Sequence, residues 1–255
     1  MYFILEFLKK IKRNYGALMN KKSIYDNGVY SDNNPGFNDK ESIRKSNSLI
    51  NILKKSSVDL SNINSILDYG CGGGGLIAEL CKSLPQVSEA KGLDLNKDAI
   101  EYALSKNRNS DVLQFRAGSL EEIDSNYDLI TVVHVLEHIQ DWDVFLSTIK
   151  GKASYIYISV PIEASMWMTM RKNVLLDQYR KYGHIHFFNE PYLVNYLEES
   201  GLEVLSTGYS DEFLAFNGLM SNIIKIPRVA IGLVSKRVAC NVLGGYCFQV
   251  LCKVK

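Results

Sequence analysis

The stretch Ile66-Leu67-Asp68-Tyr69-Gly70-Cys71-Gly72-Gly73-Gly74-Gly75 decides the fold of this chain. Its apolar first half is typical of a buried strand, and its glycines form a loop directly before a helical pattern. Glycines let the backbone approach a ligand that side chains would exclude, and a helix start offers N–H groups to it. Gly70, Gly72 and Gly75 also satisfy the pattern G-x-G-x-x-G, so the loop alone leaves a dinucleotide site open.

Strand and helix patterns alternate on both sides of this loop. We expect strands at 63–69, 90–95, 112–117, 127–133, 155–160, 203–209 and 246–254, and helices at 1–19, 42–55, 74–84, 98–107, 142–150 and 191–200, with a mostly helical pattern over 211–239. This alternation predicts an α/β fold with a Rossmann-like, seven-stranded, mostly parallel sheet and helices on both faces. N-terminal helices and a helical insertion before the last strand complete the expected fold.

Length and composition fit one domain. The chain has 255 residues, of which 46% are hydrophobic and 22% charged, and these values exclude a disordered chain. We expect a single domain over 1–255, with an N-terminal helical cap (1–60), a cofactor-binding half (61–161) and an acceptor-binding half (162–255). The five cysteines form neither a disulfide framework nor a zinc signature, which favours a reduced, cytoplasmic location.

Basic residues gather at the two ends of the chain. Residues 1–22 and 213–255 each carry an excess of Lys and Arg, so the middle of the chain is acidic. Such ends can meet an anionic membrane surface, or they can pack on the core or on a second subunit of a homodimer. We expect at most weak, salt-sensitive membrane contact. We expect no nucleic-acid partner, because the middle holds no basic stripe interleaved with aromatic residues.

Two acidic residues narrow the class of ligand. Asp68 lies two residues before the first glycine, where its carboxylate would repel a pyrophosphate and attract an ammonium or sulfonium group. Asp94 closes the second strand and is placed to accept hydrogen bonds from both hydroxyls of a ribose. An NAD(P)-dependent oxidoreductase would need an apolar residue at position 68 and a Tyr-x-x-x-Lys pair. Tyr102 and Lys106 have that spacing, but they fall on the helix after the second strand.

Four motifs, in this order, resemble those of the class I S-adenosylmethionine-dependent methyltransferases. They are the glycine loop 68–74, the ribose strand 92–95, the fourth strand with the segment Val132-Val133-His134-Val135-Leu136-Glu137-His138-Ile139, and the segment Gly183-His184-Ile185-His186-Phe187-Phe188. The last two are similar to the "EVLEHV" and "GHxxFF" segments of ubiquinone-biosynthesis-like and sugar-modifying members. The resemblance covers roughly residues 47–210. It implies an enzyme that uses S-adenosylmethionine to methylate a small-molecule or saccharide acceptor.

The resemblance also implies which residues contact the cofactor. The expected contacts are Asp68, Gly70, Cys71, Gly72, Asp94, Leu95, Ser119, Leu120 and His134. Leu95 is expected to pack on the adenine, and Cys71 to act as a small spacer within the loop. Members of the family commonly place an acid after the third strand to hold the adenine amino group. Ser119 stands there in this chain, and its hydroxyl accepts a weaker hydrogen bond than a carboxylate does.

All four histidines fall between positions 134 and 186, near the strand ends where open α/β sheets build their sites. We expect a general base for a hydroxyl acceptor among His138, His184 and His186. His184 and His186 are two residues apart, which in a strand would face them one way. The alternative for each is a buried histidine bonded to the backbone. No metal is expected, because no cysteine or carboxylate ligand pattern accompanies these residues.

The acceptor side is less clearly marked in the sequence. The aromatic and Met-rich stretch 166–182 is expected to form the acceptor pocket together with the N-terminal segment. Two alternative functions stay open, an NAD(P)-dependent oxidoreductase and a non-catalytic protein that keeps the methyltransferase fold. The intact glycine loop and Asp94 argue against the second. The identity of the acceptor, the atom methylated and the oligomeric state are not fixed by any motif.

Overall fold

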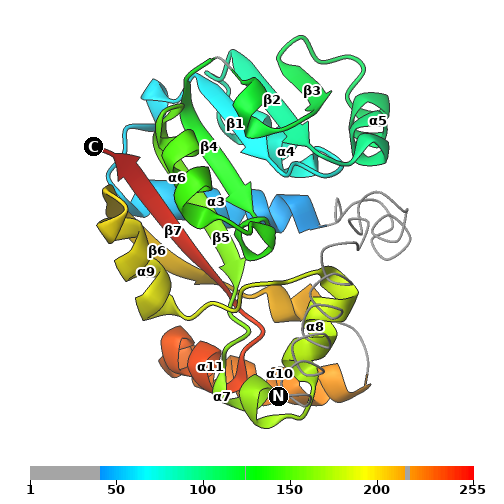
Figure 1. Ribbon diagram of the computed structural model, residues 1–255, viewed down its shortest axis with the longest axis vertical. Helices are drawn as coiled ribbons and strands as arrows, with labels where there is room; N and C mark the ends of the chain where they lie inside the picture. The colour runs from blue at the N-terminus through cyan, green and yellow to red at the C-terminus, as the bar shows by residue number, and fades with distance from the viewer. Residues whose placement is uncertain (1–40, 124, 216–218) are drawn as a thin grey trace, which may run out of the picture. The chain divides into compact units, whose positions relative to one another are not determined.

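A seven-stranded mixed sheet runs through the computed structural model, which describes residues 41–123, 125–215 and 219–255 (Figure 1). The strands are β1 (Ser65–Tyr69), β2 (Glu89–Asp94), β3 (Leu113–Ala117), β4 (Tyr127–Val133), β5 (Ala153–Pro161), β6 (Leu202–Ser210) and β7 (Cys247–Val254). Their order is β3-β2-β1-β4-β5-β7-β6. Strand β7 runs antiparallel between β5 and β6, whereas the other paired strands are parallel.

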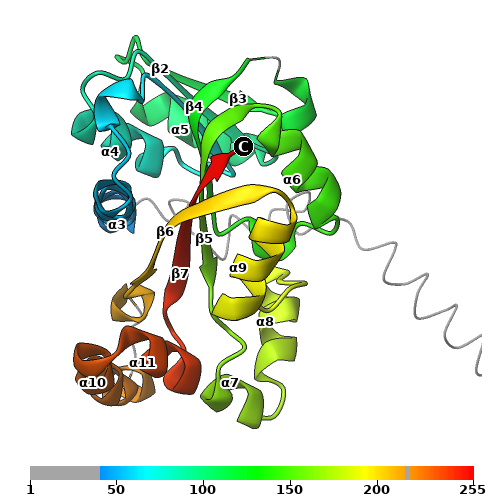
Figure 2. The same cartoon turned by 90° about the vertical axis from the view of Figure 1, so that its left-hand side faces the viewer.

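Helices cover both faces of this sheet (Figure 2). Helices α3 (Ser42–Lys55) and α4 (Gly75–Ser83) pack on one face and α6 (Trp142–Lys150) and α9 (Glu190–Glu199) on the other, while α5 (Lys97–Lys106) packs against β2 and β3. Four further helices lie beyond the end of β5, namely α7 (Met166–Met170), α8 (Val174–Tyr182), α10 (Leu219–Val234) and α11 (Lys236–Leu243). The described residues belong to one unit, Gly36–Lys255.

The central strands are buried because both faces of the sheet are covered. Ile66 and Leu67 are neighbours on β1, point to opposite faces and are both 0% exposed. Ile66 joins a core with Leu49 and Leu53 of α3, whereas Leu67 joins a second core with Leu146 of α6. The continuous apolar run in β1 therefore follows from a strand that has helices on both sides.

The sheet topology has a switch point at the carboxyl end of β1. Strand β1 pairs with β2 on one side and with β4 on the other, so successive connections depart in opposite directions from this point. Ligands of open α/β sheets bind at such a switch point, outside the carboxyl ends of the strands. The glycine loop after β1, Asp94 at the end of β2 and His134 after β4 all lie at this edge.

The predicted α/β class, with seven strands and helices on both faces, is confirmed, and α10 and α11 form the insertion before the last strand. Residues 1–19, expected as a helix, lie outside the described residues. The stretch 166–182, expected to form the acceptor pocket, contains α7 and α8, neither of which has a buried residue, and its role at the acceptor stays a prediction. In the described part of the chain, no helix combines the length and apolarity needed to cross a membrane. All five cysteines are free thiols.

Candidate functional site

The loop after β1 has a backbone conformation that favours glycine. Gly70 has a φ of +76°, and a Cβ built on it would lie 2.2 Å from Cγ2 of Val135. Gly74 has the same φ and is the residue that precedes the first turn of α4. A side chain at either position would be strained and would clash, at Gly74 with Cε1 of Phe115, 2.5 Å from the built Cβ. The glycines are therefore required by the tight path of the chain into α4.

Backbone hydrogen bonds hold this loop against β2. The N–H groups of Gly70 and Cys71 both donate to the carbonyl oxygen of Leu93, at 2.7 and 3.1 Å. The Cys71 side chain is 8% exposed, and burial raises the pKa of its thiol well above the ordinary value. A buried, protonated thiol is a poor nucleophile. Cys71 is thus a small buried spacer in the loop.

The carboxylate of Asp94 links the glycine loop to the start of α5. Its Oδ2 accepts a hydrogen bond from Gly72 N at 2.9 Å, and its Oδ1 accepts one from Asn96 N at 2.8 Å. Burial raises the pKa of Asp94, while these N–H donors act in the opposite direction. Each carboxylate oxygen has a second lone pair. Asp94 can therefore fix the loop and still accept hydroxyl groups from a ligand.

Asp68 lies deeper in the site, at the end of β1. It is 2% exposed, and its Oδ1 accepts a hydrogen bond at 2.6 Å from the hydroxyl of Thr131 on the adjacent strand β4. Burial raises the pKa of Asp68 to about 7, although the bond from Thr131 opposes this shift. A cationic ligand group nearby would favour the charged form. Asp68 is thus suited to a ligand that brings its own positive charge.

The residues expected to contact the adenine differ in which of their atoms are accessible to a ligand. Leu95 is 60% exposed beside Asp94, so its apolar surface is available to a ligand. Leu120 is 1% exposed and packs in the core, which leaves only its backbone for that role. The Ser119 side chain hydrogen-bonds to Glu121 and lowers the pKa of that carboxyl group. Sequence reasoning missed Glu121, although an acid two residues after the expected acidic position was a usable signal.

His134 has a strained backbone at the end of β4. Its φ is +57°, which is uncommon for a residue with a Cβ. Its Nε2 lies 3.5 Å from Sγ of Cys247, and its Nδ1 lies 3.7 Å from Oε1 of Glu137. Burial lowers the pKa of His134 well below the ordinary value, and the charge of Lys45 on α3 acts in the same direction. His134 is therefore a neutral imidazole beside Glu137 and Cys247.

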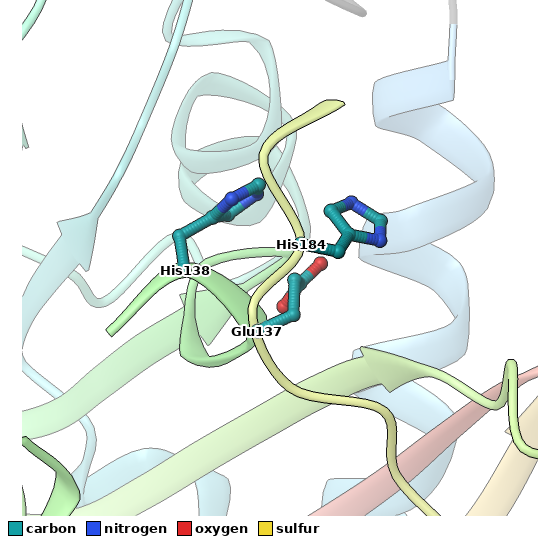
Figure 3. Close-up of side chains that lie close together, drawn as sticks. All are labelled: Glu137, His138 and His184. Atoms are coloured by element: carbon teal, nitrogen blue, oxygen red, sulfur yellow. The ribbon is translucent and has the colours of Figure 1, made fainter. Parts of the chain in front are cut away.

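Glu137, His138 and His184 come together from two distant segments (Figure 3). Glu137 and His138 lie on the 3-10 helix η4 (Leu136–His138), and His184 lies between α8 and α9. The rings of His138 and His184 meet edge to face, with centroids 4.9 Å apart. The N–H groups of Ile185 and His186 both donate to the carbonyl oxygen of Glu137, which holds the two segments together.

Glu163, which follows β5, binds the imidazole of His184. Its Oε2 lies 2.8 Å from Nδ1 of His184. Burial by itself would lower the pKa of His184, but the hydrogen bond and charge of Glu163, with the charge of Glu137, raise it. A carboxylate at Nδ1 places the proton there and leaves the Nε2 lone pair as a base. Sequence reasoning did not single out Glu163, whose only signal was its place just after the carboxyl end of a strand.

The other two histidines have different surroundings. Nδ1 of His138 lies 3.2 Å from the carbonyl oxygen of Gly183, and burial lowers the pKa of His138 to about 4. Nε2 of His186 lies 2.8 Å from the carbonyl oxygen of Ile139, and its ring packs on Trp142 with centroids 4.6 Å apart. The expectation that His184 and His186 face one way is wrong, because this segment is not a strand and the two rings have separate partners.

The cluster has the ligand types of a divalent-cation site. Glu137, His138 and His184 each offer one ligand atom, and these atoms lie within 4.8 Å of one another. Glu137 is 0% exposed, and neither carboxylate oxygen has a hydrogen-bond partner in the described part of the chain. Two imidazoles and a carboxylate suit zinc and other transition metals. The sequence argument against a metal overlooked Glu137 as the accompanying carboxylate, and the absence of a metal stays a prediction.

Comparison with known proteins agrees with this geometry. Residues 35–207 match a family model described as a methyltransferase domain. The chain is 27% identical over 144 residues to the mitochondrial ubiquinone biosynthesis O-methyltransferase of Saccharomyces cerevisiae, which covers 53% of this chain and 43% of that protein. It is 32% identical over 101 residues to the ubiquinone biosynthesis O-methyltransferase of Rickettsia bellii, which covers 39% of this chain and 41% of that protein. The matched region thus spans less than half the length of these two relatives.

A solved structure shows the same fold. It is the magnesium protoporphyrin IX methyltransferase of Synechocystis PCC 6803 with bound SAH, with a TM-score of 0.55 and 15% sequence identity. The match covers 84% of this chain and 83% of that one. At this level of identity the likeness shows the fold alone.

Proposed function

The chain belongs to the methyltransferase domain family, and we propose that it transfers a methyl group from S-adenosylmethionine to a hydroxyl group of a small-molecule or saccharide acceptor. The observation that carries the proposal is the placement of two groups at one edge of the sheet. The loop fixed by Asp94 lies after β1, and the imidazole fixed by Glu163 belongs to a cluster that begins directly after the adjacent strand β4. A donor site and a base for the acceptor are the two requirements of this reaction.

The residues around the loop fit S-adenosylmethionine. Asp94 offers carboxylate oxygens to the ribose hydroxyls, and the exposed side chain of Leu95 offers an apolar surface to the adenine. We assign the contact with the adenine amino group to Ser119, whose side chain is hydrogen-bonded to Glu121. Asp68 is the buried acid that a positively charged ligand would keep ionised. When bound, the cofactor supplies a methyl group activated by its attachment to a sulfonium.

Among the three histidine candidates, His184 is the best base. Its raised pKa and its Nδ1 bond to Glu163 leave an Nε2 lone pair that can accept the proton of an acceptor hydroxyl. The pKa of His138, about 4, makes it a weak base at neutral pH, although its ring contacts that of His184. His186 is held by Trp142 and a backbone carbonyl, which is a structural role. The acceptor hydroxyl is then held next to His184, and its proton passes to Nε2 as the acceptor oxygen takes the methyl group, whose bond to the sulfur breaks and leaves a neutral thioether.

A thermal-shift experiment tests the proposed class directly. S-adenosylhomocysteine at about a hundred times its dissociation constant should stabilise the fold by about 2.7 kcal/mol and raise the Tm by several degrees. NAD at the same concentration should leave the Tm unchanged, because Asp68 disfavours a pyrophosphate beside the loop. Stabilisation by NAD alone would support the oxidoreductase alternative. Stabilisation by neither ligand would support a non-catalytic protein with this fold.

A further inference from the structure

A polar groove lies between α3 and the end of β6, outside the cofactor loop. Its volume is about 320 Å³, within the range of sites that take small ligands. One wall is α3, and the other comprises the end of β6 and the start of α11. Figure 2 shows α3 on the face of the sheet opposite α9, near the β6 edge. The site described above uses none of the residues that line this groove.

One face of α3 supplies a polar stripe to the groove. Its residues recur three and four positions apart, so they lie in one row along the helix: Arg44, Asn47, Ser48, Asn51 and Lys55. From Arg44 to Lys55 the row extends about 16 Å at the rise of an α-helix. Leu49 and Leu53, which lie off this row, are both 0% exposed and hold the helix on the sheet. The stripe is therefore held in a fixed position.

The floor of the groove is built from buried polar atoms. Gln249 of β7 is 2% exposed, and its side chain exchanges hydrogen bonds with the hydroxyl of Ser48 at 2.7 and 2.9 Å. Gly208 of β6 has no side chain there, and a Cβ built on it would lie 2.6 Å from Cδ1 of Ile52. Because residue 208 is glycine, β6 can pass close to α3. No side chain at this position covers the polar atoms of Gln249 and Ser48 at the floor of the groove.

The charges of the groove favour an anion. Its basic residues are Arg44, Lys55 and Lys236, and its acidic residue is Asp211. Asp211 pairs with Lys236 at 2.9 Å, and Arg44 lies 3.5 Å from Glu41, which is not part of the groove lining. Lys55 therefore places a positive charge at the C-terminal end of the α3 wall. The middle of that wall carries the amides of Asn47 and Asn51 and the hydroxyl of Ser48. A ligand with several hydroxyl groups and one phosphate matches this distribution.

We propose that this groove binds a phosphate-bearing, hydroxyl-rich ligand of about the size of a hexose phosphate, with the phosphate toward Lys55. Arg44 and the amides of Asn47 and Asn51 then contact the hydroxyl-rich part. That this ligand is part of the methyl acceptor rests on the proposed function, whereas the binding itself does not.

Calorimetric titration of the full chain tests the groove without methyl transfer. The probes are glucose 1-phosphate, galactose 1-phosphate and, for comparison, glucose. Lys55→Glu should weaken binding of the phosphorylated probes at least about tenfold, because it replaces an attraction to the phosphate by a repulsion. Lys54→Glu is the matched control, since it makes the same charge change one position along the helix and outside the groove lining. Asn51→Trp should abolish binding by filling the groove.

The outcomes separate this proposal from the proposed function. Binding of a sugar phosphate that is weakened by Lys55→Glu and retained in Lys54→Glu supports the groove. Failure of both phosphorylated probes, equal binding of glucose, or equal losses in the two lysine variants overturns it. S-adenosylhomocysteine is titrated into the same samples. Its binding shows that the variants are folded, and its failure to bind the unsubstituted chain would count against the proposed function alone.

Discussion

Nδ1 of His184 lies 2.8 Å from Oε2 of Glu163, and the two side chains are only 12% and 9% exposed. The two residues are 21 positions apart and join the end of β5 to the segment before α9. A partly desolvated carboxylate beside an imidazole strengthens the base and fixes which nitrogen carries the proton. This pair distinguishes His184 from His138, although the two rings are in contact.

Removal of the Glu163 charge should weaken the base. His184 acts in its unprotonated form, so turnover should rise with pH through its raised pKa. In Glu163→Gln that pKa falls, so the acidic limb of the kcat profile should move to lower pH while the plateau drops by about 10–100-fold. A pH–rate profile with an accepted substrate measures both effects, and NMR titration of the His184 imidazole measures the pKa without an acceptor.

Two further variants serve as references for this experiment. His184→Ala should lose about 10²–10⁴-fold in turnover with unchanged affinity for S-adenosylhomocysteine. Glu199→Gln, at an exposed position at the end of α9, should leave the profile as it is. If Glu163→Gln has an unaltered profile and an unaltered His184 pKa, Glu163 does not position the base.

Replacement of Asp68 by asparagine should stabilise the folded protein and weaken its binding of S-adenosylmethionine. The pKa of Asp68 is about 7 in the folded protein against an ordinary 3.8, so ionisation of this buried group opposes folding. The resulting loss in the free energy of unfolding is absent below about pH 4, grows as the pH rises and is complete above about pH 7. Asp68→Asn should therefore raise the free energy of unfolding at pH 8 by an amount on the order of a few kcal/mol, with little gain at pH 4.

Urea denaturation at the two pH values measures this difference, with exposed Asp111→Asn as the control. The same Asp68→Asn protein should bind S-adenosylmethionine more weakly, since it lacks a partner for the positive charge. An equal stability gain at both pH values would show that packing, and not ionisation, accounts for the effect.

Chelation decides between proton transfer and a metal at the cluster. Our account uses His184 as a base, so dialysis against EDTA should leave turnover unchanged. A cation held by Glu137, His138 and His184 would occupy the same imidazole and make activity depend on the metal. Loss of turnover on chelation, with recovery when zinc or magnesium is restored, would replace the base mechanism by a metal-assisted one.

Helix α10 exposes apolar side chains next to basic ones. Ile226, Leu233 and Val234 are 73%, 84% and 90% exposed, and residues 219–243 contain four Lys or Arg and no acidic residue. We expect at most a weak association with anionic vesicles that disappears at high salt. Flotation with phosphatidylglycerol vesicles measures it, and Leu233→Asp should reduce it. No binding even at low salt would contradict membrane contact and favour packing on a second subunit.

Elements with a strong local pattern could be predicted closely from the sequence. Helices α3 and α6 and strand β4 have the predicted bounds, because each combines a clear apolar period with polar ends. The glycine loop was also predictable, since its residues are adjacent in the chain. The contact of Glu163 with His184 was not, because it depends on how the end of β5 and the segment after α8 meet in space.

Other differences have the same physical origin. The stretch 166–182 is rich in apolar residues, yet no residue of α7 or α8 is buried. Leu120 lies next to the adenine position in sequence, but its side chain turns into the core. Local composition does not determine which side of a short segment faces the core. The contribution of Gln249 to the polar groove likewise depends on the antiparallel placement of β7 beside β6.

The central claim is that the loop held by Asp94 binds S-adenosylmethionine, and calorimetry on one variant tests it most directly. Titration with S-adenosylhomocysteine should show binding to the unsubstituted chain and a loss of roughly 1.5–3 kcal/mol in Asp94→Ala, because charge-assisted hydrogen bonds to the ribose disappear. Asp111→Ala, at an exposed position, should bind as the unsubstituted chain does. Unchanged affinity in a folded Asp94→Ala protein, or no binding to the unsubstituted chain, would contradict the account.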